Sequence, residues 1–339
     1  MEKVRVGIIG AGRIGRVHSK SLTNNIPEAE LVAISDKFVE SAKKAAEEFG
    51  IPNYYEDYHK ILEDPTIQAV FVCSPTNTHA DIAMEAAKAG KHIFCEKPID
   101  TSVAKILETE KVVKEAGVKM QIGFNRRFDH NFRKIHELAK NGDLGDIQIV
   151  KITSRDPEPP SAEYAAASGG MFLDMTIHDF DMAAYQAGSP VEEVYAVGAV
   201  TVDPAIGEAG DIDTAIITLK FENGAIGVID NCRQAVYGYD QRVEVFGTKG
   251  AAAADNDTET NVTVSTKECV SKDKPLFFFL ERYMQSFTDE MKQFIQAIEE
   301  DKEVPVGIHA GLMSVVLAKA AKKSLDEHRP VKISEICEA

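Results

Sequence analysis

Near the start of the chain stands the stretch Val4-Arg-Val-Gly-Ile-Ile-Gly-Ala-Gly-Arg-Ile-Gly15, and Asp36 follows 21 residues after it. The apolar run predicts a buried strand, and the glycines predict a tight turn that opens a helix. Gly10 permits the turn, Gly12 lets a pyrophosphate approach the backbone, and Gly15 lets the helix pack closely on the sheet. Because Asp36 ends the next predicted strand, the spacing indicates a dinucleotide-binding β-α-β unit.

The residues around this turn predict the cofactor. Asp36 can accept hydrogen bonds from ribose hydroxyls and repel a 2′-phosphate, which favours NAD. Lys37 is a cation beside the same ribose, so a 2′-phosphate could still be tolerated. Further cofactor contacts are expected from the turn and from the ends of later strands, at Arg13, Ile14, Ser74, Asn77, His79, Glu96 and Lys97. Helix capping is an equal alternative for Asn77.

Residues 1–124 alternate short apolar runs with helical stretches. Buried strands separated by helices predict parallel β-α units, and right-handed crossovers then give a doubly wound sheet of the Rossmann type. We take these residues as the dinucleotide-binding domain. The predicted strands are residues 4–9, 30–36, 68–73, 92–95 and 118–123, and the predicted helices are residues 13–22, 39–49, 78–89 and 101–116.

The pattern changes over residues 125–339, where strands follow one another with little helix between them. Such runs predict an α+β domain with an antiparallel sheet and helices on one face. The abrupt boundary predicts that substrate binds in a cleft between the two domains. Strands are predicted at residues 147–153, 191–202, 214–221, 225–231, 242–246 and 262–265, and helices at 128–140, 170–187, 283–299 and 307–324.

The composition excludes several classes of function. Lys and Arg number 38 against 54 Asp and Glu, so the net charge is −16 and binding to nucleic acid or to an anionic membrane is not expected. Apolar runs are too short to span a bilayer, and the N-terminus shows no secretion signal, so we expect a cytoplasmic protein. The five cysteines form no C-x-x-C pair, which argues against a disulfide framework and a thiol-rich zinc site.

Glu96-Lys97-Pro98 directly follows the predicted strand at residues 92–95. Lys97 is therefore expected at the carboxyl edge of the sheet, where open α/β folds bind ligands. Pro98 restricts the preceding residue to extended backbone conformations. A lysine in this place can donate a hydrogen bond to a reacting oxygen; a solvated surface lysine is the alternative.

Asp174, His178, Asp181 and Tyr185 recur every three or four residues in an otherwise apolar stretch. On one helix they would form a polar stripe, and buried polar groups need partners. His178 is then a core histidine bonded to Asp174, an acid-base group oriented by Asp174, or, with Asp179 and Asp181, a metal ligand. We favour the acid-base role and expect no metal, because no H-E-x-x-H pattern or second close histidine is present.

Together these motifs resemble the Gfo/Idh/MocA oxidoreductases, over essentially the whole chain. Four segments are similar to the inositol dehydrogenase branch of that family: Gly123-Phe-Asn-Arg-Arg127-Phe-Asp, Thr153-Ser-Arg-Asp156-Pro-Glu-Pro-Pro, Gly170-Met-Phe-Leu-Asp-Met-Thr-Ile-His-Asp-Phe-Asp181 and Tyr237-Gly-Tyr-Asp-Gln-Arg-Val-Glu-Val-Phe-Gly247. The resemblance implies an N-terminal Rossmann domain and a C-terminal domain with an open-faced antiparallel sheet. It also implies a homo-oligomer, a dimer or a homotetramer, assembled through that sheet.

The resemblance implies the roles of the site residues as well. Lys97, Asp174 and His178 correspond to the catalytic residues, and Arg127, Asp156 and Tyr237, with the catalytic three, to contacts with a small polyol substrate. The expected reaction is NAD-dependent oxidation of a secondary ring hydroxyl of myo-inositol to a ketone. His178 would take the hydroxyl proton, and Lys97 would stabilise the developing alkoxide.

Two alternatives stay open. One is a dehydrogenase of the same family that acts on another cyclitol or on an aldose. It stays open because the sequence does not show how the pocket distinguishes axial from equatorial hydroxyls. The other is a non-catalytic dinucleotide sensor, similar to the galactose-pathway repressor that has this fold. The presence of Lys97, Asp174 and His178 favours an enzyme over a sensor.

Overall fold

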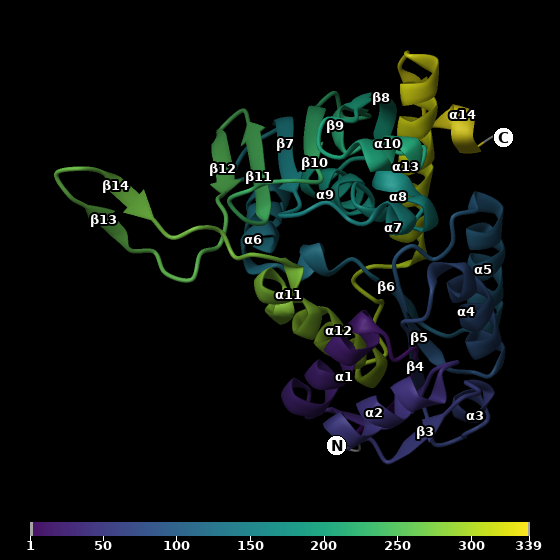
Figure 1. Cartoon of the computed structure of the whole chain (residues 1–339). Coiled ribbons are helices and arrows are strands. Elements are labelled where there is room, and N and C mark those ends of the chain that lie inside the picture. The colour runs from purple at the N-terminus through teal and green to yellow at the C-terminus, as the bar shows by residue number, and fades with distance from the viewer. Residues whose placement is uncertain (1–2, 338–339) are drawn as a thin grey trace. The chain divides into compact units, whose positions relative to one another are not determined.

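The computed structural model describes residues 3–337, which divide into two compact units (Figure 1). The first unit runs to Phe128 and takes in residues 285–315, and the second contains residues 129–284 and the chain from Val316 onward. The sequence pattern had suggested a single boundary after residue 124. The structure adds a later segment to the first unit, because helix α12 (Met284–Glu299) contributes apolar side chains to its core.

The sheet of the first unit has six parallel strands in the order β3-β2-β1-β4-β5-β6. This order confirms the doubly wound sheet, whose direction of winding reverses beside β1. β3 was not predicted, because it is three residues long and mostly exposed. The strands are β1 (Val4–Ile9), β2 (Ala29–Ser35), β3 (Asn53–Tyr55), β4 (Ala69–Val72), β5 (His92–Glu96) and β6 (Met120–Gly123).

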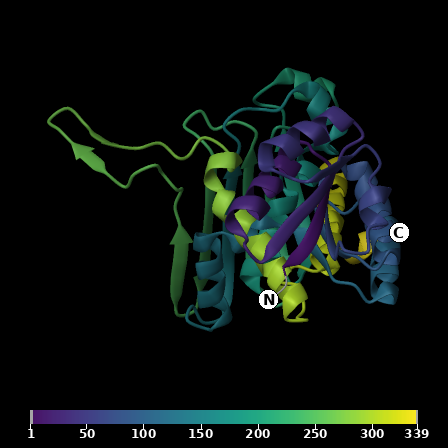
Figure 2. The ribbon, with the colours of Figure 1, turned by 90° about the horizontal axis from the view of Figure 1, so that it is seen from below.

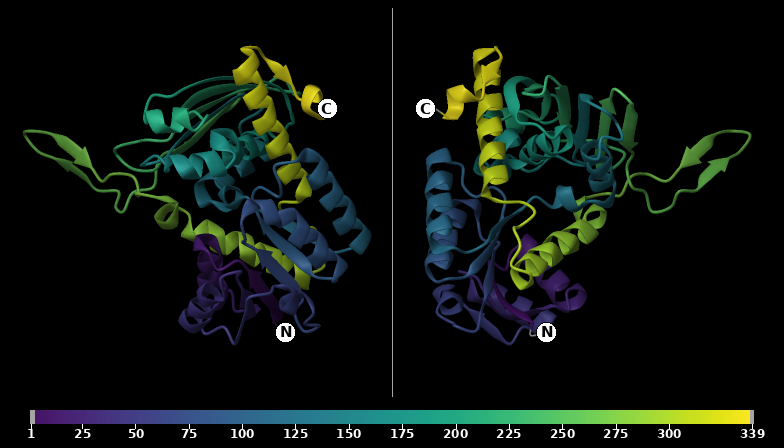
Figure 3. Two further views of the ribbon diagram at one scale, coloured as in Figure 1. Left: turned by 45° about the vertical axis from the view of Figure 1, so that its right-hand side comes forward. Right: turned by 180° about the vertical axis from the view of Figure 1, so that it is seen from behind.

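One core of the first unit joins the sheet to three helices. Phe71 and Phe94 of the sheet and Phe294 of α12 are all fully buried in it, with Leu22 of α1. Figure 3 shows α12 beside α1, where the Thr288 hydroxyl donates a hydrogen bond to the Ser21 hydroxyl. The remaining helices are α1 (Arg13–Asn25), α2 (Val39–Phe49), α3 (His59–Leu62), η1 (Thr76–Thr78), α4 (His79–Lys88), α5 (Val103–Ala116) and η2 (Asn125–Phe128).

The second unit is built on a seven-stranded sheet in the order β12-β11-β7-β10-β9-β8-β15. β7 and β10 pair in parallel, so the sheet is mixed where the sequence had suggested an antiparallel one. The other neighbours are antiparallel. The strands are β7 (Ile147–Arg155), β8 (Val191–Ala199), β9 (Thr214–Phe221), β10 (Ile226–Cys232), β11 (Asp240–Gly247), β12 (Gly250–Ala254) and β15 (Val331–Lys332).

Helices cover one face of this sheet, and the other face carries exposed apolar side chains. Alternating burial along β9 shows the two-sided pattern. Apolar residues on the exposed face include Tyr195, Val197, Ile216, Ile226 and Phe246. The helices of the unit are α6 (His130–Lys140), α7 (Ala162–Ala167), α8 (Gly170–Asp174), α9 (Ile177–Ala187), α10 (Pro204–Glu208), α11 (Phe279–Arg282), α13 (Ile308–Glu327, from Val316 onward) and α14 (Ser334–Cys337).

The helix predicted over residues 170–187 is broken into α8 and α9. The Thr176 amide donates to the carbonyl of Met171, five residues back, and its hydroxyl donates to Asn231 Oδ1 at 2.6 Å. These two bonds interrupt the regular pattern of a helix. The prediction of a single continuous polar stripe is therefore wrong, because Asp174 ends α8 and His178 lies in the first turn of α9.

A small hairpin of β13 (Thr263–Ser265) and β14 (Val270–Lys272) projects from the second unit (Figure 2). All six of its strand residues are exposed. Across residues 3–337, no helix combines the length and the apolar character that crossing a membrane requires.

Candidate active site

The glycines of the first turn are required by its geometry. Gly10 has a φ of 107°, and a Cβ there would lie 2.5 Å from the backbone of Cys73. A Cβ at Gly15 would lie 1.9 Å from the carbonyl oxygen of Gly10. A Cβ at Gly12 would instead meet nothing within 4 Å. The turn thus packs tightly on the protein side at Gly10 and Gly15 and stays open at Gly12.

The N-terminus of α1 suits the phosphates of a dinucleotide. Gly12 occupies the N-cap position without a side-chain cap, and the first turn of α1 has no acidic residue. The N–H groups at such a helix end point outward and carry partial positive charge, so they bind phosphate oxygens. Arg13, in the first turn, is exposed, and Ile14 packs against the core of the unit.

Asp36 is fixed at the end of β2 by two backbone amides. Its Oδ2 accepts from Ala11 N at 2.8 Å, and its Oδ1 accepts from Phe38 N at 2.9 Å. The carboxylate is therefore joined directly to the glycine turn, while Lys37 is exposed. A carboxylate held in this place fits the ribose hydroxyls of NAD.

The loops after β4 and β5 are joined through His79. One ring nitrogen lies 2.8 Å from the carbonyl oxygen of Pro98, and the other lies 2.7 Å from that of Ser74. The Ser74 hydroxyl also lies 2.7 Å from that of Thr78, and Asn77 is exposed in η1. The buried His79 ring therefore joins the loop after β4 to the loop after β5. Both loops contain residues that were predicted to contact the cofactor, such as Ser74 and Lys97.

Glu96 is the last residue of β5, and Lys97 directly follows it. The Glu96 side chain turns inward and contacts His18 Nε2 at 2.6 Å. Lys97 is half-buried, and its peptide bond to Pro98 is cis. The structure thus places the predicted catalytic lysine directly after a buried, anchored glutamate.

In the second unit, Arg233 connects two of the predicted site residues. Its Nη1 donates to Asp174 Oδ2 at 3.1 Å and to Asp156 Oδ2 at 3.4 Å. The Arg233 side chain is only 4% exposed. Although burial acts to lower the pKa of Arg233, the carboxylates of Asp174 and Asp156 raise it overall, so the guanidinium stays charged. Asp174 also accepts from the Tyr164 hydroxyl at 3.1 Å.

Sequence reasoning missed Arg233. It follows β10, and its partners Asp174 and Asp156 lie 59 and 77 residues before it. No motif in the sequence links these positions. Only the pairing of β7 with β10 brings the two strand ends together, and Asp156 N donates to the Cys232 carbonyl beside Arg233 at 3.0 Å.

The segment before His178 begins with two glycines. Gly170 has a φ of 82°, and a Cβ there would lie 2.8 Å from Asp211 Oδ1. That oxygen accepts from Met171 N at 3.1 Å and so satisfies an amide at the start of α8. Gly170 and Asp211 together fix where α8 begins, and hence where Asp174 lies.

His178 lies in the first turn of α9 and is half-buried. The next residue, Asp179, is fully buried and accepts from Asn231 Nδ2 at 2.9 Å, which fastens α9 to β10. Asp181 is buried as well. The hydrogen bonds of Asp179 and Thr176 to the same Asn231 side chain give the start of α9 a rigid base.

Of the other predicted polyol contacts, Tyr237 lies on the loop between β10 and β11, and Arg127 lies in η2. Tyr237 is 39% exposed, donates to Asp240 Oδ2 at 2.5 Å and accepts from Arg155 Nη1 at 3.2 Å. It lines an open cavity with Glu158 and Phe277. Arg127 is half-buried in η2, where its amide donates to the Phe124 carbonyl. Arg127 belongs to the first unit, and Tyr237 to the second.

Two family models match the chain. An NAD-binding Rossmann fold of the oxidoreductase family matches residues 4–124, and the GFO/IDH/MocA C-terminal domain matches residues 132–253. An uncharacterized oxidoreductase of Bacillus subtilis is 53% identical over 98% of this chain and 97% of its own length. A myo-inositol 2-dehydrogenase of Thermotoga maritima is 49% identical over 98% and 99%.

A solved structure extends these matches to a protein with its ligands. The scyllo-inositol dehydrogenase of Lactobacillus casei with bound NAD(H) and scyllo-inositol superposes with a TM-score of 0.90. It is 30% identical, and the match covers 98% of this chain and all of that one. With the glycine turn, Asp36 and both domain models in place, the chain belongs to the Gfo/Idh/MocA family of oxidoreductases with an NAD-binding Rossmann fold.

Proposed function

We propose that this protein oxidises a secondary ring hydroxyl of myo-inositol to the inosose ketone, with NAD as the hydride acceptor. The observation that carries the proposal is the full-length match to a myo-inositol 2-dehydrogenase in a chain that has Lys97, Asp174 and His178. The bound NAD(H) and scyllo-inositol of a structural relative support the same class of substrate.

The proposed chemistry assigns one step to each polar group. His178 in its neutral form takes the hydroxyl proton as general base. Lys97 donates a charge-assisted hydrogen bond to the alkoxide that develops on the same oxygen. Asp174, held by Arg233 at 3.1 Å, orients His178 and offsets local positive charge. When bound at the glycine turn, NAD supplies the hydride-accepting nicotinamide.

Substrate recognition in this proposal rests on groups that pair with ring hydroxyls. Arg127 supplies donors and Asp156 acceptors, and Tyr237 adds a hydroxyl group. The hydrogen bond from Arg233 Nη1 holds the Asp156 carboxylate in place at 3.4 Å. A pocket that pairs each hydroxyl discriminates strongly against an analogue lacking one, because its own polar groups are then left unpaired.

We also propose that the protein works in the cytoplasm as a homo-oligomer, a dimer or tetramer. The exposed apolar side chains on the open sheet face, such as Ile216, Ile226 and Phe246, support association through that face. NAD is the proposed cofactor over NADP because Asp36 is held by two amides at the ribose position.

Initial rates of NADH formation test the proposal. The purified protein is assayed with NAD and, separately, with myo-inositol, scyllo-inositol, a deoxy-inositol and a set of aldoses. We expect the highest kcat/KM for myo-inositol and a large loss for the deoxy compound. Turnover of an aldose without turnover of any inositol would reassign the substrate. Binding of NAD without turnover of any compound would favour a sensor.

A further inference from the structure

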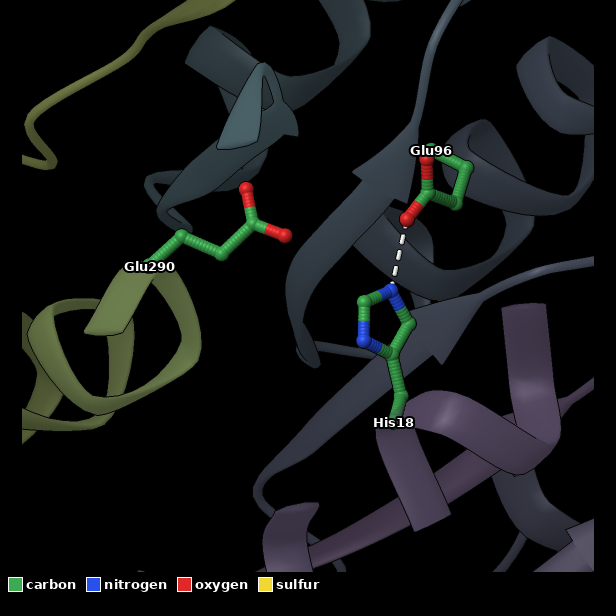
Figure 4. A group of neighbouring side chains, drawn as sticks. All are labelled: His18, Glu96 and Glu290. Carbon is green, nitrogen blue, oxygen red and sulfur yellow. Dashed lines mark hydrogen bonds and ion pairs between the residues drawn. The ribbon is translucent and has the colours of Figure 1, made fainter. Parts of the chain in front are cut away.

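Three titratable side chains meet inside the first unit, apart from the groups assigned to substrate (Figure 4). They are His18 of α1, Glu96 at the end of β5 and Glu290 of α12. His18 and Glu290 are fully buried, and Glu96 is 8% exposed. One nitrogen or oxygen from each side chain lies within 4.8 Å of the other two. We call these residues the buried triad.

Only one contact within the triad is a direct hydrogen bond, between His18 Nε2 and Glu96 Oε1 at 2.6 Å. His18 Nδ1 and both carboxyl oxygens of Glu290 have no hydrogen-bond partner. Figure 4 shows the Glu290 carboxyl group pointing toward His18 and Glu96. Buried polar atoms without partners are rare, so these three call for a shared proton, a water or an ion.

The surroundings of the triad disfavour a second negative charge. The rings of Phe71, Phe94 and Phe287 pack around the His18 ring, with centroids 5.3 to 6.2 Å away. Burial, and then the charge of Glu96, raise the pKa of Glu290 well above its ordinary value. The thiols of Cys73 and Cys95 nearby add no charge, because burial and Glu96 raise their pKa as well.

The geometry favours a proton over a metal ion as the shared group. Ligand atoms on one zinc ion lie about 2.0 to 2.2 Å from the metal, which puts neighbouring ligands about 3 Å or more apart. The His18–Glu96 contact of 2.6 Å is shorter, and it is a direct hydrogen bond with no room for an ion between the two atoms. A cation would have to break that bond, whereas a proton on Glu290 leaves it intact.

We propose that Glu290 is an uncharged carboxylic acid and that Glu96, bonded to His18, is the single carboxylate of the triad. His18 and Glu290 then act as positioning residues for Lys97, because they hold Glu96 in place. In this arrangement the Glu290 hydroxyl donates toward His18 Nδ1, and His18 Nε2–H donates to Glu96. His18 Nδ1 and one carboxyl oxygen of Glu290 then belong to one chain of hydrogen bonds that ends at Glu96. The positioning role rests on the proposed function of Lys97.

The triad acts on Lys97 through the backbone, because Lys97 directly follows Glu96, the last residue of β5. Anchoring the Glu96 side chain in the interior fixes the backbone at the end of β5, from which Lys97 follows. Glu96 also packs on β6, where a Cβ at Gly123 would lie 3.0 Å from its carboxyl oxygen. α12 is held in register by Gln121, whose Nε2 donates to the Glu290 carbonyl at 2.8 Å. The end of β5 is therefore fixed from two sides.

Infrared spectroscopy tests the protonation state without any turnover. Exposed glutamates are ionised at neutral pH, so a carboxylic acid C=O band there reports a buried acid. We expect such a band in the wild-type protein, its shift when glutamate is labelled with carbon-13, and its loss in Glu290→Gln. If labelled wild-type protein shows no acid band, the proposal is wrong, whether or not the variant folds. One equivalent of metal in purified wild-type protein would equally overturn it.

Steady-state kinetics test the positioning role, with whichever substrate supports NADH formation. Glu290→Gln keeps an uncharged hydrogen-bonding group and should stay within about twofold of wild type. His18→Phe should lower kcat about 10-fold or more with KM for NAD nearly unchanged, because Lys97 is misplaced. His18→Gln, which still donates to Glu96, should recover part of that loss. Ser21→Ala, also buried on α1, is the matched control. Equal kcat in wild type and both His18 variants would refute the positioning role while leaving the proposed reaction intact.

Discussion

Arg233 and Asp174 form a nearly buried ion pair, with Arg233 Nη1 3.1 Å from Asp174 Oδ2 and side chains only 4% and 15% exposed. The same nitrogen contacts Asp156. One cation thus fixes both the carboxylate proposed to orient His178 and a carboxylate proposed to bind the polyol. Breaking this pair should affect catalysis and stability together.

Replacing Arg233 by Met removes the guanidinium that both carboxylates contact. We expect a loss of about 3 kcal/mol or more in the free energy of unfolding, measured by denaturant titration, because breaking a buried ion pair strands the remaining charge. The kcat/KM for oxidation should fall about 10-fold or more, since Asp174 loses its fixed orientation. Arg233→Lys keeps the charge and should be affected less. An Arg233→Met protein with wild-type stability and activity would show that the ion pair neither stabilises the fold nor orients Asp174 for catalysis.

Asp36 should determine the choice between NAD and NADP. In Asp36→Ser combined with Lys37→Arg, the ratio of kcat/KM for NADP to that for NAD should rise about 10-fold or more, because the anion that repels the 2′-phosphate is removed and a guanidinium can pair with that phosphate. Lys37→Arg alone is the control and should change the ratio little, since Asp36 keeps its two amide bonds. A wild-type protein that already prefers NADP would contradict the role given to Asp36.

Lys97 should act in the transition state more than in binding. Lys97→Met is expected to lower kcat about 100-fold or more, while the dissociation constant for NAD, measured by fluorescence titration, stays close to wild type. Lys88→Met, which removes an exposed lysine from α4 of the same unit, is the matched control. Wild-type kcat in the Lys97 variant would remove this residue from the mechanism.

The base should appear in the pH dependence of oxidation. A base must be neutral to take the hydroxyl proton, so kcat/KM should rise with pH through one ionisation and then level off. In His178→Ala this rise should flatten and kcat/KM should fall at every pH. An unchanged pH profile in the variant would assign the proton transfer to another group.

The parts of the fold and site that the sequence predicts are local. Gly10, Gly12 and Asp36 lie within one β-α-β unit, where fixed spacing is enough to place them. The place of Lys97 can also be predicted locally, because Lys97 follows the end of a strand and precedes a proline. In the structure, Asp36 accepts from Ala11 N in the glycine turn, and Gly10 and Gly15 leave no room for a Cβ.

The parts that the sequence does not predict depend on distant partners. Arg233 and Glu290 meet their partners across many residues, and neither lies in a recognisable motif. The break between α8 and α9 escaped prediction because apolar residues continue through it, while the bond from Thr176 to Asn231 that accompanies it is long-range. The parallel pairing of β7 with β10 also escaped prediction, because the two strands are far apart in the sequence and no local pattern indicates that they are neighbours.

Deuterium transfer tests the central claim most directly. The wild-type protein is incubated with NAD and myo-inositol that carries deuterium on the carbon bearing the oxidised hydroxyl, and the reduced cofactor is analysed by mass spectrometry. The account predicts NADH that contains one deuterium, together with an equal amount of inosose, because the hydride moves directly from that carbon to NAD. Unlabelled NADH, or no NADH from any inositol, would contradict it.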